Sequence, residues 1–379
     1  MDKLIPFNSP HVPEISKRYV LEALEASHQQ GDGPFTAKAS KMLSELVGGG
    51  YVLLTPSCTH ALEMASMLAN IGPGDEVILP SFTFTSAATA VTKFGARPVF
   101  VDVAMKSKGI DVDQVREAIT PRTKAISWVN YAGVAPDIVN LRSIANEFDL
   151  LLIEDNAHGL GGTYQGKPLG SFGDFATQSF HATKNIQCGE GGALVVNNPK
   201  FIGRAEIIRE KGTDRSKFVR GEVQKYQWVD HGSSYLLAES LAAVLLGQFE
   251  SFLEIQESRK MICKQFANTV KPFELLSNSD EANNVAHMFY IQFSTEKEAL
   301  SFKANMRAEQ VSANSHYEPL SQSQFAEMFL MPQRNTHVTN NIAKTLVRLP
   351  VWFGMKHDII DLIVEATTSS LSKVELGSK

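Results

Sequence analysis

A carboxylate and a lysine lie in segments of very different composition. Asp155 closely follows the apolar run 150–153, and Lys184 comes 29 residues after Asp155, inside the polar, small-residue segment 179–185. An enzyme that uses pyridoxal phosphate (PLP) needs one lysine to hold the cofactor covalently and one acid to fix the charge on its pyridine nitrogen. The pair therefore predicts a PLP enzyme in which Lys184 is the covalent anchor and the acid/base catalyst, and Asp155 pairs with the ring nitrogen.

Each of the two residues also has an ordinary interpretation. Asp155 alone could be a turn or capping residue, and Lys184 alone could be a surface lysine. Two neighbouring features favour a cofactor site. Small residues around the lysine leave room for a flat ring, and Ser179, five residues before it, can bond a phosphate oxygen.

The segment 55–63 follows the first predicted strand and opens a helix with hydroxyl and small side chains. The unpaired N–H groups and the positive dipole end of such a helix suit a phosphate. An ordinary N-cap is the plain alternative. Position favours the phosphate, because ligands of parallel sheets bind beyond the carboxyl ends of the strands, where Asp155 also lies.

Two aromatic residues follow the second predicted strand, in the segment 80–86. Phe84 could stack on the ring of a cofactor. Phe82 could do the same, or both side chains could belong to the core.

Nucleotide-binding motifs are absent or broken. Gly161, Gly166 and Lys167 match GxxxxGK, but Pro168 stands where a P-loop needs Ser or Thr, and no helix pattern follows. A β-turn is the preferred interpretation. No GxGxxG follows the first predicted strand, so a nicotinamide-binding fold would lack its phosphate site.

Short β-branched or leucine-rich runs alternate with helical patterns along the first 155 residues. The runs begin near residues 51, 76, 98, 124 and 150. Alternation at this spacing is typical of βαβ units. We therefore expect an α/β fold with a mostly parallel sheet, followed by shorter strands with tight turns.

A smaller α+β domain is expected after a long helical pattern at about 236–260. Strands are predicted at 287–293 and 346–351, and helices at 296–308 and 358–371. Because 379 residues are many for one core, we place a large PLP-binding domain at 1–249 and the smaller domain at 250–379.

Composition argues against several classes of partner. The chain has 36 basic and 41 acidic residues, a net charge of −5, and no long like-charged cluster, so we expect no nucleic-acid or lipid partner. Three cysteines without CxxC spacing fit reduced thiols rather than disulfides or a metal site. No apolar leader or membrane-length run is visible, so we expect a soluble, cytoplasmic protein.

Longer motifs occur in six segments of the chain: 31–36, 55–59, 131–135, 179–185, 209–213 and 225–236. These motifs resemble the DegT/DnrJ/EryC/StrS family of sugar-nucleotide aminotransferases, which have fold type I of the PLP enzymes. The resemblance covers nearly the whole chain. It is closest to the branch that aminates dTDP-4-dehydro-6-deoxy-D-glucose at C4.

The resemblance implies a role for each candidate site residue. Lys184 would hold PLP, Asp155 would pair with the pyridine nitrogen, and His158 would lie near the phenolic oxygen. Asn156 and His158 depart from that branch, which more often has Ala and Gln there. The other implied contacts are those of Ser57, Cys58 and Ser179 with the phosphate, Phe84 with the ring, Ser234 with the phosphate bound by the neighbouring subunit, and His316, Tyr317, Lys211 and Arg215 with the substrate.

The same resemblance implies the reactants and the assembly. L-glutamate would donate the amino group to a dTDP-linked keto sugar in a homodimer with shared active sites. The product would be a dTDP-4-amino-4,6-dideoxyhexose, of galacto or gluco configuration, for a surface polysaccharide such as the O-antigen of lipopolysaccharide. The alternatives are a 3-keto sugar-nucleotide aminotransferase and a PLP-fold regulator without turnover. Related sugar dehydratases carry His where this chain has Lys184, so the lysine argues against a dehydratase activity.

Overall fold

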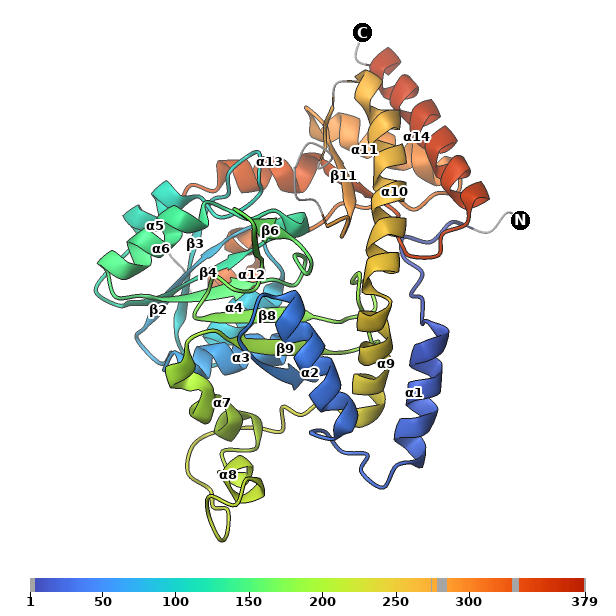
Figure 1. Ribbon diagram of the computed structural model, residues 1–379. Coiled ribbons are helices and arrows are strands. Elements are labelled where there is room, and N and C mark those ends of the chain that lie inside the picture. The colour runs from blue at the N-terminus through green and yellow to red at the C-terminus, as the bar shows by residue number, and fades with distance from the viewer. Residues whose placement is uncertain (1–3, 274, 278–284, 329–333, 378–379) are drawn as a thin grey trace.

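A seven-stranded sheet lies at the centre of the molecule (Figure 1). The computed structural model describes residues 4–273, 275–277, 285–328 and 334–377. In their order across the sheet, the strands are β1 (Tyr51–Thr55), β9 (Gly192–Val196), β8 (Phe175–Ser179), β5 (Leu151–Asp155), β4 (Thr123–Val129), β2 (Glu76–Pro80) and β3 (Arg97–Val101). The strands from β8 to β3 are parallel, and β9 is antiparallel to β1 and β8. The expected α/β fold with a mostly parallel sheet is confirmed.

Helices cover both faces of this sheet, so its strands are buried on both sides. Successive residues of β2 show the alternation, because Val77 and Leu79 pack into one core and Ile78 packs into another. The first core includes α3 (Cys58–Leu68), α4 (Thr85–Thr92) and α7 (Ile202–Arg209). The opposite face is covered by α5 (Val112–Ala118), α6 (Ile138–Glu147), α2 (Pro34–Leu46) and α9 (Glu239–Glu250).

The helical pattern expected at 236–260 is divided into two helices. α9 ends at Glu250, and α10 (Phe252–Val270) begins after Ser251. The reason lies in the two cores that the helices serve. Phe249 of α9 packs near the large sheet, whereas Phe266 of α10 packs with the C-terminal strands.

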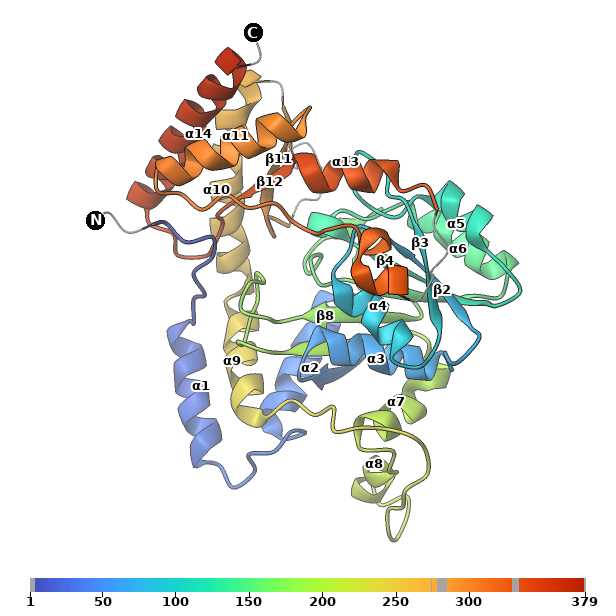
Figure 2. The same ribbon diagram turned by 180° about the vertical axis from the view of Figure 1, so that it is seen from behind.

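A second core lies in the C-terminal part of the chain, where α10 and α14 pack against each other (Figure 2). Strands and helices stand at all four predicted places. Ile5 also packs into this core, so the start of the chain contributes to it. The division at 249/250 stays a prediction. The elements are β10 (Leu276–Ser277), β11 (Phe289–Gln292), β12 (Leu346–Leu349), α11 (Glu296–Ala308), α12 (Gln324–Met328), α13 (His337–Thr345) and α14 (His357–Gly377).

An arm that includes α8 (Arg215–Val219) extends from the body of the molecule (Figure 1). A bridge between Thr213 and Trp228 closes its base. Its apolar side chains are exposed, with 70% of Val219 and 76% of Trp228 accessible to solvent. This surface is unusual for a monomer and suits a protein interface.

The remaining elements are short. β6 (Thr163–Tyr164) and β7 (Lys167–Pro168) form a hairpin across Gln165 and Gly166, so the P-loop-like match is a turn, as predicted. Within the described residues, short 3-10 turns stand at 131–133, 199–201, 271–273 and 320–322. α1 (Glu14–Glu25) packs against α9. No helix in the described part of the chain is long and apolar enough to cross a membrane.

Candidate active site

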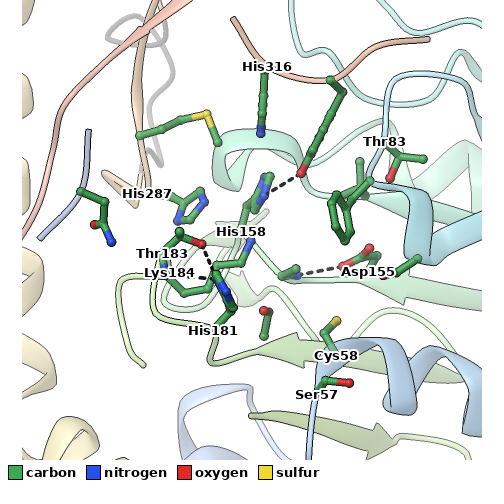
Figure 3. A pocket seen from close by; sticks show the side chains of 18 of the residues that line it. Ser57, Cys58, Thr83, Asp155, His158, His181, Thr183, Lys184, His287 and His316 are labelled. Carbon is green, nitrogen blue, oxygen red and sulfur yellow. Dashed lines mark hydrogen bonds between the residues drawn. The ribbon is translucent and has the colours of Figure 1, made fainter. Parts of the chain in front are cut away.

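A cavity of about 640 Å³ lies between the large sheet and the C-terminal strands (Figure 3). Its wall brings together residues from nearly the whole chain, from Phe7 to Val351. Nine of the residues singled out from the sequence line it: Ser57, Cys58, Phe84, Asp155, His158, Ser179, Lys184, His316 and Tyr317.

Asp155 is the last residue of β5, and its side chain is buried against the cavity. The N–H of Ala157 donates to Oδ1 over 3.0 Å. Burial raises the pKa of Asp155 above its ordinary value, although the Ala157 bond and the charge of Lys184 act in the opposite direction. A charged hydrogen-bond donor placed in the cavity would therefore stabilise this carboxylate.

Lys184 lies in the connection between the antiparallel strands β8 and β9. Its backbone N–H donates to the carbonyl of His181 over 2.8 Å, which fixes a tight turn. Enclosure lowers the pKa of the side-chain amine to about 8, while the nearby Asp155 carboxylate opposes the shift. A substantial fraction of the amine is therefore neutral, and hence nucleophilic, near pH 8.

The start of α3 faces the same cavity. Ser57 is the N-cap residue, and its hydroxyl accepts a bond of 3.2 Å from the N–H of His60. The N–H groups of Cys58 and Thr59 lie in the first turn, where no helical carbonyl can accept them. Gly192 allows β9 to approach this turn, since a Cβ there would lie 2.3 Å from the carbonyl carbon of Ser57.

Three stacked imidazoles form the side of the cavity opposite the sheet. The N–H of Ala132 points to Nδ1 of His158 over 3.4 Å, so Nε2 carries the proton and donates to the hydroxyl of Tyr317 over 3.2 Å. The ring of His287 stacks on His158 with 4.3 Å between centroids, and His316 continues the stack. Burial lowers the pKa of all three histidines well below the ordinary value. The cluster is neutral at physiological pH.

His287 was not found from the sequence as a site residue, because it only begins a predicted strand. Asn185, next to Lys184, donates to the carbonyl of Val285 over 2.9 Å and faces Nδ1 of His287 over 3.0 Å. With the amide so oriented, its oxygen accepts the proton of Nδ1. The loop that carries Lys184 is thus bonded to the segment leading into β11. No sequence signal marks this pairing.

Arg348 of β12 is a second cavity residue that sequence reasoning missed. Its position within a short apolar strand gave no sign of a site. Three other residues singled out from the sequence, Ser234, Lys211 and Arg215, do not line the cavity of their own chain, and their predicted roles stay predictions. The backbone of Ser234 forms a β-bridge with that of Glu210 at the base of the arm. The carboxylate of Glu210 pairs with Lys211 at 3.2 Å and with Arg215 at 2.6 Å.

The structure separates the two phenylalanines that the sequence left open. Phe82 is buried in the core beside Tyr131, whereas Phe84 is 56% exposed and lines the cavity. Asn156 does not line the cavity. Its amide oxygen accepts a bond of 2.8 Å from Asn130, so Asn156 supports the end of β5 from behind.

These groups fit PLP. Among the described residues, only Ala157 donates to the Asp155 carboxylate, and no hydrogen-bond partner is seen for the amine of Lys184. A buried carboxylate with an open oxygen suits a pyridinium N–H, and a lysine with a lowered pKa suits a covalent bond to an aldehyde. The free N–H groups of α3, with Ser57 and Ser179 beside them, suit a phosphate.

Comparison with known proteins gives one family and several similar structures. The DegT/DnrJ/EryC1/StrS aminotransferase family matches residues 12–368. Uncharacterized protein MJ1066 of Methanocaldococcus jannaschii is 32% identical over 262 residues, which are 68% of each chain. Spr1654 from Streptococcus pneumoniae, in its PMP form, has a TM-score of 0.90 at 24% identity over 98% of this chain and all of its own. DesI, solved with its TDP-sugar product, has a TM-score of 0.86 at 23% identity over all of this chain and 96% of its own.

Proposed function

The chain belongs to the DegT/DnrJ/EryC1/StrS aminotransferase family, and from this premise we propose that it transfers the amino group of L-glutamate to C4 of dTDP-4-dehydro-6-deoxy-D-glucose. The family makes it a PLP-dependent aminotransferase. The product of the proposed reaction is a dTDP-4-amino-4,6-dideoxyhexose, a building block for a surface polysaccharide.

One observation carries the proposal: Lys184, with its lowered pKa, faces the same cavity as the buried Asp155. In our assignment, Lys184 holds the cofactor, Asp155 keeps a proton on its ring nitrogen, and Ser57, Cys58 and Ser179 bind its phosphate. Phe84 supports one face of the ring, and His158 lies near its phenolic oxygen. When bound, PLP supplies an electron sink that stabilises negative charge on the carbon that loses its proton.

The amine of Lys184 moves the protons in both halves of the proposed reaction. Once released from the cofactor, the neutral amine takes the α-proton of glutamate, and in the second half the same group returns a proton to the sugar carbon. A pKa of about 8 suits both tasks, because the group gives up its proton near the working pH. Because the histidine cluster around His158 is neutral, it adds no charge that would weaken the bond between the Asp155 carboxylate and the ring nitrogen.

Support for the C4 position comes from the motifs at 31–36, 55–59 and 226–236, which resemble the C4-specific branch. The similar fold of DesI, whose structure holds a TDP-sugar product, agrees with a dTDP-linked substrate. The carbonyl carbon must come within about 3 to 3.5 Å of the amine that attacks it. A 3-keto isomer would displace its carbonyl by an ångström or more, and we expect it to react far more slowly.

Product analysis tests this function directly. The holoenzyme is incubated with L-glutamate and dTDP-4-dehydro-6-deoxy-D-glucose, and the sugar is identified by NMR, which also distinguishes the galacto from the gluco amine. We expect amination at C4 and none with a Lys184→Ala variant. Faster amination of the 3-keto isomer would contradict the proposed substrate.

A homodimer with shared active sites is part of the proposal. Ser234, Lys211 and Arg215 lie outside the cavity of their own chain, at the base of an arm with exposed apolar side chains. This arrangement is consistent with contacts to the cofactor and nucleotide of a partner subunit.

A further inference from the structure

Arg348 places a guanidinium group on the cavity wall. It extends from β12, and Phe7 covers one face of the group with 4.6 Å between the guanidinium carbon and the ring centroid. The amide of Asn8 donates to the carbonyl of Ala182 over 2.9 Å, which ties this N-terminal segment to the loop that carries Lys184. Arg348 is therefore held between a fixed aromatic ring and the cavity.

The hydrogen bonds of Arg348 leave part of its fork open. Nε and Nη2 donate to the carbonyl of Ser315 over 3.3 and 2.9 Å. A guanidinium has five N–H groups, so three remain. No carboxylate pairs with Arg348 in the part of the chain that the structure describes. Of the cavity's acidic residues, Asp155 accepts a bond from the N–H of Ala157, and Glu190 lies beside His181.

A partly buried guanidinium without a counter-ion has a desolvation cost, and burial lowers the pKa of Arg348 accordingly. The cost is offset when an anion binds, and a carboxylate matches the planar fork of arginine with two parallel bonds. The cavity wall holds two lysine or arginine residues among those described, Lys184 and Arg348. Because Lys184 is assigned to the chemistry, Arg348 is the permanent cation left for substrate recognition.

We propose that Arg348 binds a carboxylate group of the amino donor and so selects an amino acid for the first half of the reaction. The inference rests on the proposed function, since it assumes that an amino acid enters this cavity. Glutamate offers two carboxylates, one on the α-carbon and one on the side chain, and both have the chemistry that Arg348 recognises.

Separate half-reactions test the proposal. The Arg348→Met holoenzyme in its PLP form is mixed with L-glutamate alone. The same variant in its pyridoxamine phosphate form is mixed with the keto sugar alone, and both reactions are followed by the absorbance of the cofactor. Loss of a charged, paired bond predicts a rise of roughly 10- to 100-fold in the glutamate concentration for half-maximal rate. The value for the keto sugar should stay within about twofold, since that half-reaction contains no amino acid. Arg348→Lys, which keeps the charge without the fork, should fall between Arg348→Met and wild type.

A binding measurement provides a readout other than turnover. Added 2-oxoglutarate should raise the unfolding temperature of the wild-type holoenzyme, because a ligand stabilises the state that binds it. The rise should be lost in Arg348→Met. Lys303→Met is the matched control: Lys303 bonds the hydroxyl of the same Ser315 over 2.7 Å but lies outside the cavity. It should behave as wild type in both measurements.

The two carboxylates are distinguished by comparing L-glutamate with L-alanine. Equal losses in Arg348→Met point to the α-carboxylate, and a loss confined to glutamate points to the side chain. Unchanged use of glutamate, or an equal loss for the keto sugar, would overturn the inference and assign Arg348 to the sugar nucleotide or to structure. A wild-type enzyme that accepts no amino group from glutamate would instead refute the proposed function.

Discussion

The charges of Lys184 and Asp155 each shift the pKa of the other residue. Burial disfavours the ionised form of both, which lowers the pKa of the lysine and raises that of the aspartate, while each charge partly restores the other. Without a cofactor, the protein therefore holds two groups that are poorly solvated. A ligand that bonds to both would relieve that cost.

The lowered pKa of Lys184 gives a pH dependence for PLP uptake by the apoprotein. Only the neutral amine attacks an aldehyde, and its pKa is about 8 rather than the ordinary 10.5. The rate of covalent attachment, followed by absorbance, should rise with pH and level off above about pH 8. Lys184→Ala should show no such phase. A rate that still climbs between pH 9 and 10.5 would mean that an ordinary surface lysine reacts.

Some cavity residues could be predicted from the sequence because their signal is local. Asp155 ends an apolar run, and Lys184 lies in a segment of small polar residues. Arg348 and His287 have no such signal, because each sits beside apolar residues of a strand from a distant part of the chain. Their proximity to Lys184 depends on how the second core packs on the first, and a single sequence does not encode that packing in any local pattern.

At the scale of elements, the contact between β9 and the start of α3 controls the predicted phosphate site. Gly192→Ala would place a methyl carbon 2.4 Å from the backbone nitrogen of Cys58, so the first turn must shift. We expect weaker PLP binding, by tenfold or more, and a loss of about 1–3 kcal/mol in unfolding free energy. Equilibrium titration with PLP and denaturant unfolding measure the two effects.

Gly203 supplies the matched control for this substitution. It lies within α7, where an added Cβ would meet nothing within 4 Å. Gly203→Ala should therefore keep PLP affinity and add about 0.5–1 kcal/mol of stability through helix propensity. Equal PLP affinity in the two variants would show that the start of α3 does not contribute to cofactor binding.

The order of the elements was predictable because apolar runs recur along the sequence at the spacing of βαβ units. A helix cap supplied by a residue far away in the sequence leaves no such pattern. The motif 31–36 shows the difference. The buried carboxylate of Glu239 accepts bonds from the N–H groups of Gly33, Phe35 and Thr36, at 3.1, 2.8 and 3.0 Å. An acid about 200 residues away therefore caps α2. The division at Ser251 was missed for the same reason, since only the two cores distinguish α9 from α10.

At the scale of the whole molecule, the exposed arm and the remote Lys211 give the proposed dimer a test. A Lys184→Ala chain and a Lys211→Ala chain are unfolded together, refolded and assayed. If each site takes Lys184 from one subunit and Lys211 from the other, half of the randomly paired dimers have one intact site of two. We expect about a quarter of wild-type activity from two nearly inactive parents.

Two results would contradict the shared site. One is a mixture no more active than its parents, although mass measurement shows that hybrid dimers formed. The other is a fully active monomer at assay concentration. Refolding wild-type chains in parallel controls for losses during the procedure.

Exposure of the arm also gives the protein a built-in optical reporter. Of its three tryptophans, Trp128 and Trp352 are buried at 1% and 9% exposure, and Trp228 stands open at 76%. An ionic quencher such as iodide can therefore reach the indole of Trp228 but not the two buried indoles. The quenchable share of the emission reads the surroundings of the arm alone, without any label attached to the chain.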